Sequence, residues 1–144
     1  MSELTYAIAQ KMVADALAHC RDKKFNPMSV VVLDAAGGVK AAGSEDNTTF
    51  MRWRIAYAKA FGGVAFGMPS RRIHNLAADR PHFVNALNGV AGGDIVPVPG
   101  GVIIRDASKK LLGAIGVSGD TSDNDEEAAL AAIKAAGLVA DTGS

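Results

Sequence analysis

The amino-acid sequence predicts an α+β fold in which a central antiparallel β-sheet is flanked by α-helices. Two pairs of short apolar runs, each pair separated by a turn, predict two β-hairpins. Strands joined by hairpins form antiparallel sheets. Segments with helical spacing of apolar residues lie before, between and after the hairpins. Because these helices are strongly apolar, they have to cover at least one face of the sheet.

The first helix is expected over residues 5–23, where apolar side chains recur every four positions from Ile8 to Cys20. Ser2 or Thr5 is the candidate N-cap of this helix, because both side chains can accept a hydrogen bond from a free backbone amide.

The first hairpin is expected from strands 28–34 and 39–42, which flank a turn at Gly37-Gly38. A second helix follows over residues 49–66. The pair Gly62-Gly63 weakens the C-terminal half of that helix, because glycine has a low helix propensity.

Two short helices are expected next, one over 71–78 with Ser70 as its cap and one starting at Pro81, which suits a first helical position. Residues 89–101 are rich in glycine and proline and predict a loop within the domain.

The second hairpin is expected from strands 102–106 and 111–118. The last helix is predicted over 123–136, with Ser122 as its cap and an alanine-rich buried stripe. Gly137 is expected to end it.

Size and composition indicate one domain spanning residues 1–144, with 49% apolar and 21% charged residues. Fifteen basic and fifteen acidic residues give zero net charge, which argues against a nucleic-acid partner and permits self-association. No run approaches 18 apolar residues and no basic leader precedes one, so no membrane partner is expected and the predicted location is cytoplasmic. The single cysteine, Cys20, excludes an internal disulfide and is interpreted as a buried apolar group.

The glycine-rich stretch Gly113–Gly119 suggests a phosphate site, but its spacing matches neither phosphate-binding motif. The carboxylates at positions 120–127 would occupy the field of the helix N-terminus that an anion needs. A helix start capped by Ser122 is the simpler interpretation, and a cation or polar ligand held by the acidic turn, which includes Asp125 and Glu126, is the alternative. Ser118 does not complete a nucleophile motif, because position 120 holds aspartate where the motif has glycine.

Three histidines, His19, His74 and His82, form no tight metal-binding pattern. His19 falls about 20° from Ile8 around the first helix, at the margin of the apolar face. An imidazole beside an apolar wall suits an axial ligand of haem iron, and an oligomer interface would tolerate it equally well.

Cations and glycines supply the other candidate site residues. Arg52, Arg54 and Lys59 surround the aromatic positions of the second helix, where they could bind ligand carboxylates such as haem propionates or could form a solvated face. Gly100 and Gly101 allow close backbone approach to a ligand or a tight turn.

Three segments, in order, resemble the GlcG/HbpS family, the haem-degrading domain family that is related to the C-terminal domain of PduO-type proteins. The segments that carry the resemblance are 30–38; 55–60 with 66–70; and 100–106 through 113–119 to 123–126. The resemblance covers nearly the whole chain. It implies a profilin-like domain that forms homo-oligomers and binds a small molecule, which in some relatives is haem. Where relatives often carry an arginine before an Asp-Gly pair, this chain has Ser44 and Asp46-Asn47, and where they often have serine it has Arg52. The polar wall of a pocket can therefore differ.

Three functions are consistent with these features. The first is non-catalytic binding of haem or a related tetrapyrrole, with His19 or His82 as iron ligand and Arg54 or Lys59 as propionate partner. The second is an enzyme or catabolic accessory protein acting on a small organic acid or carbonyl compound at a subunit interface. In this case Asp125, Glu126 or Lys59 would be the acid or base and Arg52 or Arg54 the carboxylate clamp. The third is a structural or partner-binding module.

Overall fold

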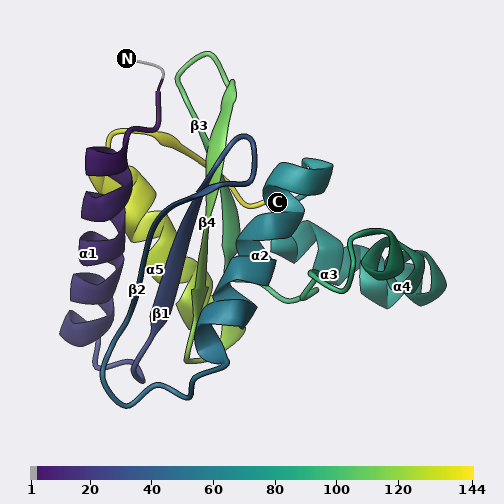
Figure 1. Ribbon diagram of the computed structural model, residues 1–144, viewed down its shortest axis with the longest axis horizontal. Coiled ribbons are helices and arrows are strands. Elements are labelled where there is room, and N and C mark those ends of the chain that lie inside the picture. Colours follow the sequence, from purple (N-terminus) through teal and green to yellow (C-terminus); the bar gives the residue numbers. More distant parts are fainter. Residues whose placement is uncertain (1–2) are drawn as a thin grey trace.

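The computed structural model describes residues 3–144, and the predicted α+β architecture is confirmed (Figure 1). Within these residues five strands form one antiparallel sheet in the order β2-β1-β4-β3-β5. The strands are β1 (Ser29–Asp34), β2 (Val39–Ser44), β3 (Gly101–Arg105), β4 (Leu111–Ser118) and β5 (Val139–Asp141). The helices are α1 (Tyr6–Asp22), α2 (Arg52–Phe66), α3 (Ser70–Asp79), α4 (Pro81–Val90) and α5 (Ser122–Ala135).

Helices cover the two faces of the sheet, and alternating strand residues point to each (Figure 1). On one face α1 and α5 bury Val30, Val32 and their neighbours on β3 and β4. On the other face α2 packs its alanines on Val31, Leu33 and Ala114. The central strands β1, β3 and β4 are therefore almost entirely buried, whereas β2 lies at an edge.

Helices α3 and α4 extend away from the sheet beyond α2 (Figure 1). They have a small apolar cluster of their own, built on Ile73, Val84 and Ile95. The predicted loop after α4 supplies Ile95 to this cluster and then leads into β3.

Glycines in the sheet bring α2 into backbone contact with it. A Cβ atom on Gly101 would lie 2.0 Å from the carbonyl oxygen of Lys59, and one on Gly116 would lie 1.9 Å from that of Ala56. The helix also continues through Gly62 and Gly63. A Cβ atom on Gly63 would lie only 3.1 Å from the Ile103 side chain of β3, so glycine lets the helix pack closely at this position too. The glycine pair that weakens helix propensity is thus used for close packing.

Helix caps show where the sequence-based expectations were wrong. Thr5 caps α1, as expected, and its Oγ1 accepts a hydrogen bond from the Ile8 amide; the Ser2 alternative lies outside the described residues. Thr121, rather than Ser122, caps α5 by accepting from the Asn124 amide. Ser70 does not cap α3 but is its first residue, and its hydroxyl binds the backbone of β3 instead. A short strand, β5, was not expected.

Candidate functional site

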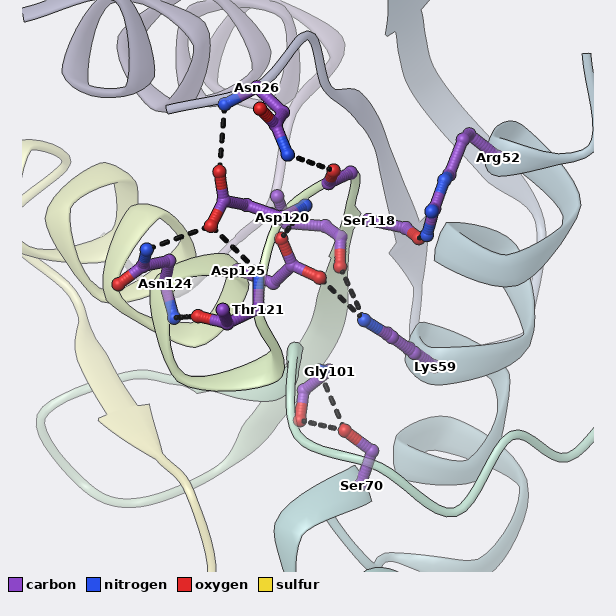
Figure 2. Close-up of polar contacts among 12 residues, drawn as sticks. Asn26, Arg52, Lys59, Ser70, Gly101, Ser118, Asp120, Thr121, Asn124 and Asp125 are labelled. Atoms are coloured by element: carbon purple, nitrogen blue, oxygen red, sulfur yellow. Dashed lines mark hydrogen bonds and ion pairs between the residues drawn. The ribbon is translucent and has the colours of Figure 1, made fainter. Parts of the chain in front are cut away.

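Two predicted site residues, Lys59 of α2 and Asp125 of α5, meet at the end of the sheet where β4 ends and β3 begins (Figure 2). Lys59 Nζ donates to Asp125 Oδ2 at 2.9 Å and to the backbone oxygen of Val117 at 3.0 Å. Both side chains are only 2% exposed. The lysine passes over Gly100, where a Cβ would lie 2.7 Å from the ammonium nitrogen. Because Gly100 has no side chain, a lysine on one face can reach an aspartate on the other.

Burial shifts both partners of this pair towards their neutral forms. It lowers the pKa of Lys59 and raises the pKa of Asp125, while the opposite charge and the hydrogen bond between them resist both changes. The other oxygen of Asp125 accepts from the Asp120 amide at 2.9 Å. This pair has its hydrogen-bonding capacity committed within the protein, so it forms a buried connection between the helices.

Arg52 lies beside the buried pair, at the start of α2. Its Nη1 donates to Ser118 Oγ at 3.1 Å (Figure 2). Ser118 pairs in register with Ser29, whose hydroxyl hydrogen bonds to that of Ser44 at 2.7 Å. No carboxylate of residues 3–144 forms an ion pair with Arg52. The guanidinium therefore faces a row of serines without a countercharge.

Glu126 and the two candidate glycines have structural partners as well. Arg71 of α3 donates from Nε to Glu126 and from Nη2 to Asp123, at 3.0 and 2.6 Å. The Gly101 amide donates to Ser70 Oγ at 2.7 Å. The close approach predicted for Gly100 and Gly101 is made to α2 and α3 of the same chain.

His19 lies on the α1–α5 face. Its Nε2 is 2.6 Å from Glu127 Oε2, and its ring meets Phe25 edge-on with centroids 6.1 Å apart. Lys23 Nζ lies 3.9 Å from the same glutamate oxygen. The imidazole side chain is 23% exposed, so a ligand from solvent can reach it.

The other two histidines are not close partners of His19. His82 is exposed in the first turn of α4, and His74 Nδ1 lies 3.2 Å from the backbone oxygen of Pro97. Within the part of the chain that the structure describes, His, Cys, Asp and Glu side chains form no group of three suited to a metal ion.

Arg54 occupies the outer surface of α2, away from the buried pair. Its guanidinium carbon lies 5.9 Å from the centre of the Trp53 ring, and it lines two hollows together with Asp94 from the loop after α4. Sequence reasoning did not find Asp94 as a candidate, since no motif links a loop aspartate to an arginine forty positions away.

The fold and this arrangement define an α+β protein whose charged residues join two helical layers at one end of an antiparallel sheet. The chain belongs to the family described as haem-degrading protein HbpS-like, whose model matches residues 4–134. No curated protein sequence matches it at a significant level. Within residues 3–144 no helix is long and apolar enough to cross a membrane.

Solved structures share the fold at low sequence identity. A crystal structure of a PduOC–haem complex has a TM-score of 0.86 at 20% identity, covering 96% of this chain and 99% of that one. Klebsiella pneumoniae protein ORFY has a TM-score of 0.84 at 21% identity, with 93% and 90% covered. HbpS has a TM-score of 0.80 at 24% identity, with 94% and 91% covered.

Proposed function

We propose that the protein binds haem or a related tetrapyrrole, with His19 as the iron ligand. The observation that carries this proposal is a partly exposed imidazole beside an aromatic ring, where α1 meets α5. Membership of the HbpS-like haem-degrading family supports it, as does the shared fold with a domain crystallised in complex with haem.

The surroundings of His19 fit such a ligand. Phe25 offers an apolar edge for the macrocycle, and the exposed ammonium of Lys23 can bind a propionate. Haem, when bound, supplies redox and oxygen chemistry through its iron. The protein residues bind and orient it, and Glu127 has to release the His19 nitrogen if iron is to take that atom.

The other predicted haem contacts lie elsewhere in the chain. Lys59 is bonded to Asp125. Arg54 belongs to α2, which lies across the sheet from α1, the helix of His19 (Figure 1). Arg54 or His82 could therefore contact a haem bound at His19 only from a second copy of the chain. We propose a homo-oligomer on this basis, and sedimentation with and without haem measures it.

A haemin titration of the apoprotein tests the assignment. We expect a Soret shift that saturates at stoichiometric haem and is lost in His19→Ala. His74→Ala is the matched control, because His74 already binds a backbone oxygen. The assignment to His19 is wrong if no shift occurs or if His19→Ala leaves it unchanged. If the Soret shift is lost in His82→Ala alone, the iron ligand is His82 of α4 and not His19.

A second candidate function is action on a small organic acid or carbonyl compound, as an enzyme or catabolic accessory protein. The unpaired Arg52 beside Ser118 favours it, with Arg52 as the carboxylate clamp. To act as acid or base, Asp125 or Glu126 would have to leave its ion pair with Lys59 or Arg71. Short carboxylates should raise the melting temperature of the wild type in a thermal-shift titration and should leave that of Arg52→Gln unchanged. Equal shifts in both proteins would remove the basis for this function.

A further inference from the structure

We infer that the outer surface of α2 carries a second binding site, which takes a small zwitterion with an apolar body, such as an apolar α-amino acid. The site is the groove between Arg54 and Asp94. It consists of two hollows of about 280 and about 270 Å³, and both of these residues line both hollows. Each hollow is slightly smaller than the about 300–1,000 Å³ that is usual for ligand pockets, so the ligand has to be small.

The two charges that line the groove have opposite signs and are not paired with each other. Among residues 3–144 neither Arg54 nor Asp94 takes part in an ion pair. Arg54 lies near the Trp53 ring, and Asp94 is half-buried at the foot of the loop after α4. A ligand carboxylate can therefore bind the guanidinium while a ligand ammonium binds the aspartate.

The walls of the groove are apolar on both sides of these charges. Val39, Trp53 and Tyr57 line one hollow, and Trp53 is 49% exposed. The other hollow is lined by Met51, Ile55, Ala58, Gly93 and Val96. An aromatic or branched aliphatic side chain would cover apolar surface that is otherwise in contact with water, which favours binding.

Within one copy of the chain, the groove is separate from His19. Helix α2 covers one face of the sheet, whereas α1, the helix that contains His19, covers the other (Figure 1). A zwitterion binds both charges at once. A molecule with only a carboxylate would leave Asp94 without a partner, and a molecule with only an ammonium would leave Arg54 without one. This requirement distinguishes the site from a general anion-binding surface.

Trp53 is the only tryptophan of the chain, so its fluorescence reports directly on the groove. The experiment titrates the full chain with L-phenylalanine, with 3-phenylpropanoate, which lacks the ammonium, and with phenethylamine, which lacks the carboxylate. We expect saturable binding of phenylalanine, at least about tenfold tighter than either analogue. Arg54→Ala and Asp94→Asn should each weaken it by at least about tenfold in calorimetry.

Arg80→Ala is the matched control, because Arg80 likewise lies over an aromatic ring, that of Phe83 at 4.8 Å, but outside the groove. It should bind phenylalanine as the wild type does. The inference is overturned if phenylalanine shows no saturable binding up to about 10 mM, if an analogue binds as well, or if the Arg54 and Asp94 variants bind like wild type. Haemin titration of Asp94→Asn, at a residue that has no role in the haem proposal, separates the outcome of this test from that of the haem proposal.

Discussion

The ammonium of Lys59 and the carboxylate of Asp125 form a buried ion pair that joins helices on opposite faces of the sheet. Lys59 belongs to α2 and Asp125 to the first turn of α5, 66 positions away. The pair also holds the end of β4, through the Val117 carbonyl and the Asp120 amide (Figure 2). Three elements therefore depend on one contact.

Removing one partner of this pair should destabilise the fold strongly. Lys59→Met leaves the Asp125 carboxyl buried without its counterion, which typically costs about 3–5 kcal/mol. The double variant Lys59→Met, Asp125→Leu should recover part of that loss, because no charge is left unpaired. Urea denaturation measures both. Lys11→Met, which removes an exposed pair with Asp15, should change stability by less than about 1 kcal/mol. Equal effects at the two sites would contradict the interpretation.

Asp120 should make the protein sensitive to acid. Backbone amides of Asn26 and Thr121 and the side-chain amide of Asn124 each donate to it at 2.8 Å. These bonds, led by that of Asn26, lower its pKa below the ordinary 3.8. A lowered folded-state pKa gives stability that is present above pH 3.8 and is lost as the pH falls through the lower folded value.

We therefore expect Asp120→Asn to be less stable than wild type at neutral pH and to lose less stability on acidification. Urea midpoints from neutral pH to about pH 3 measure this difference. Asp79→Asn, at an exposed position, should keep the wild-type profile. If Asp120→Asn also keeps it, the three bonds do not stabilise the carboxylate.

A methyl group at Gly101 should disrupt the packing of α2 against the sheet. The Cβ of Gly101→Ala would meet the Lys59 carbonyl at 2.0 Å, and this contact is with backbone, so no side-chain rotation relieves it. We expect destabilisation of at least about 3 kcal/mol or failure to fold. Gly89→Ala in α4, where nothing lies within 4 Å, should be stabilising by up to about 1 kcal/mol. Thermal unfolding of both variants measures the difference. A similar loss of stability in Gly89→Ala would show that glycine replacement is harmful in general and that the contact at Gly101 is not the cause.

Cys20 should be unreactive in the folded protein. It is fully buried in the core between α1 and the sheet, and burial raises its pKa from 9.0 to about 12. At pH 8 the thiolate fraction is therefore very small. An aromatic disulfide reagent should label the native protein only at the rate of unfolding and should label it at once in guanidinium. Rapid labelling of the native chain would show that this part of the core opens.

Glu127 should compete with haem iron for His19. Its carboxylate binds Nε2 of the imidazole at 2.6 Å. If iron takes this nitrogen, Glu127→Gln should tighten haem binding at pH 7, because a neutral amide forms a weaker hydrogen bond to the ring nitrogen than a carboxylate does and competes less with iron. The Soret titration measures the change. Weaker binding in this variant would mean that the glutamate orients the ring for coordination through Nδ1.

Patterns of local spacing predicted most of the fold. The four-residue repeat from Ile8 to Cys20 predicted the first helix, and the turn at Gly37-Gly38 predicted the first hairpin. The observed ends of this helix and of these strands lie within one or two residues of the expected ones. The cap of α5 was missed because Thr121 and Ser122 are both competent caps, and only backbone geometry selects between them. The strand β5 has three residues, which is too short for a repeating pattern.

The sequence offered candidate residues for the site but not the contacts between them. Lys59 and Asp125 were recognised as candidates from their residue types, but their contact joins positions 66 apart and has no local signal. The helical spacing placed His19 at the margin of the apolar face of the first helix, but its bond to Glu127 depends on how α1 packs on α5. Contacts between distant segments require the fold.

Because the backbone of α2 touches that of the sheet at Gly101 and Gly116, the helix has no freedom to rotate or slide on its support. Its outward residues are consequently held at constant positions whatever their chemistry. Substitutions at Trp53 or Arg54 can thus change what the surface recognises while the scaffold beneath stays the same. Helix α2 offers a natural place for relatives of this fold to diverge in ligand, and for an engineer to exchange one specificity for another.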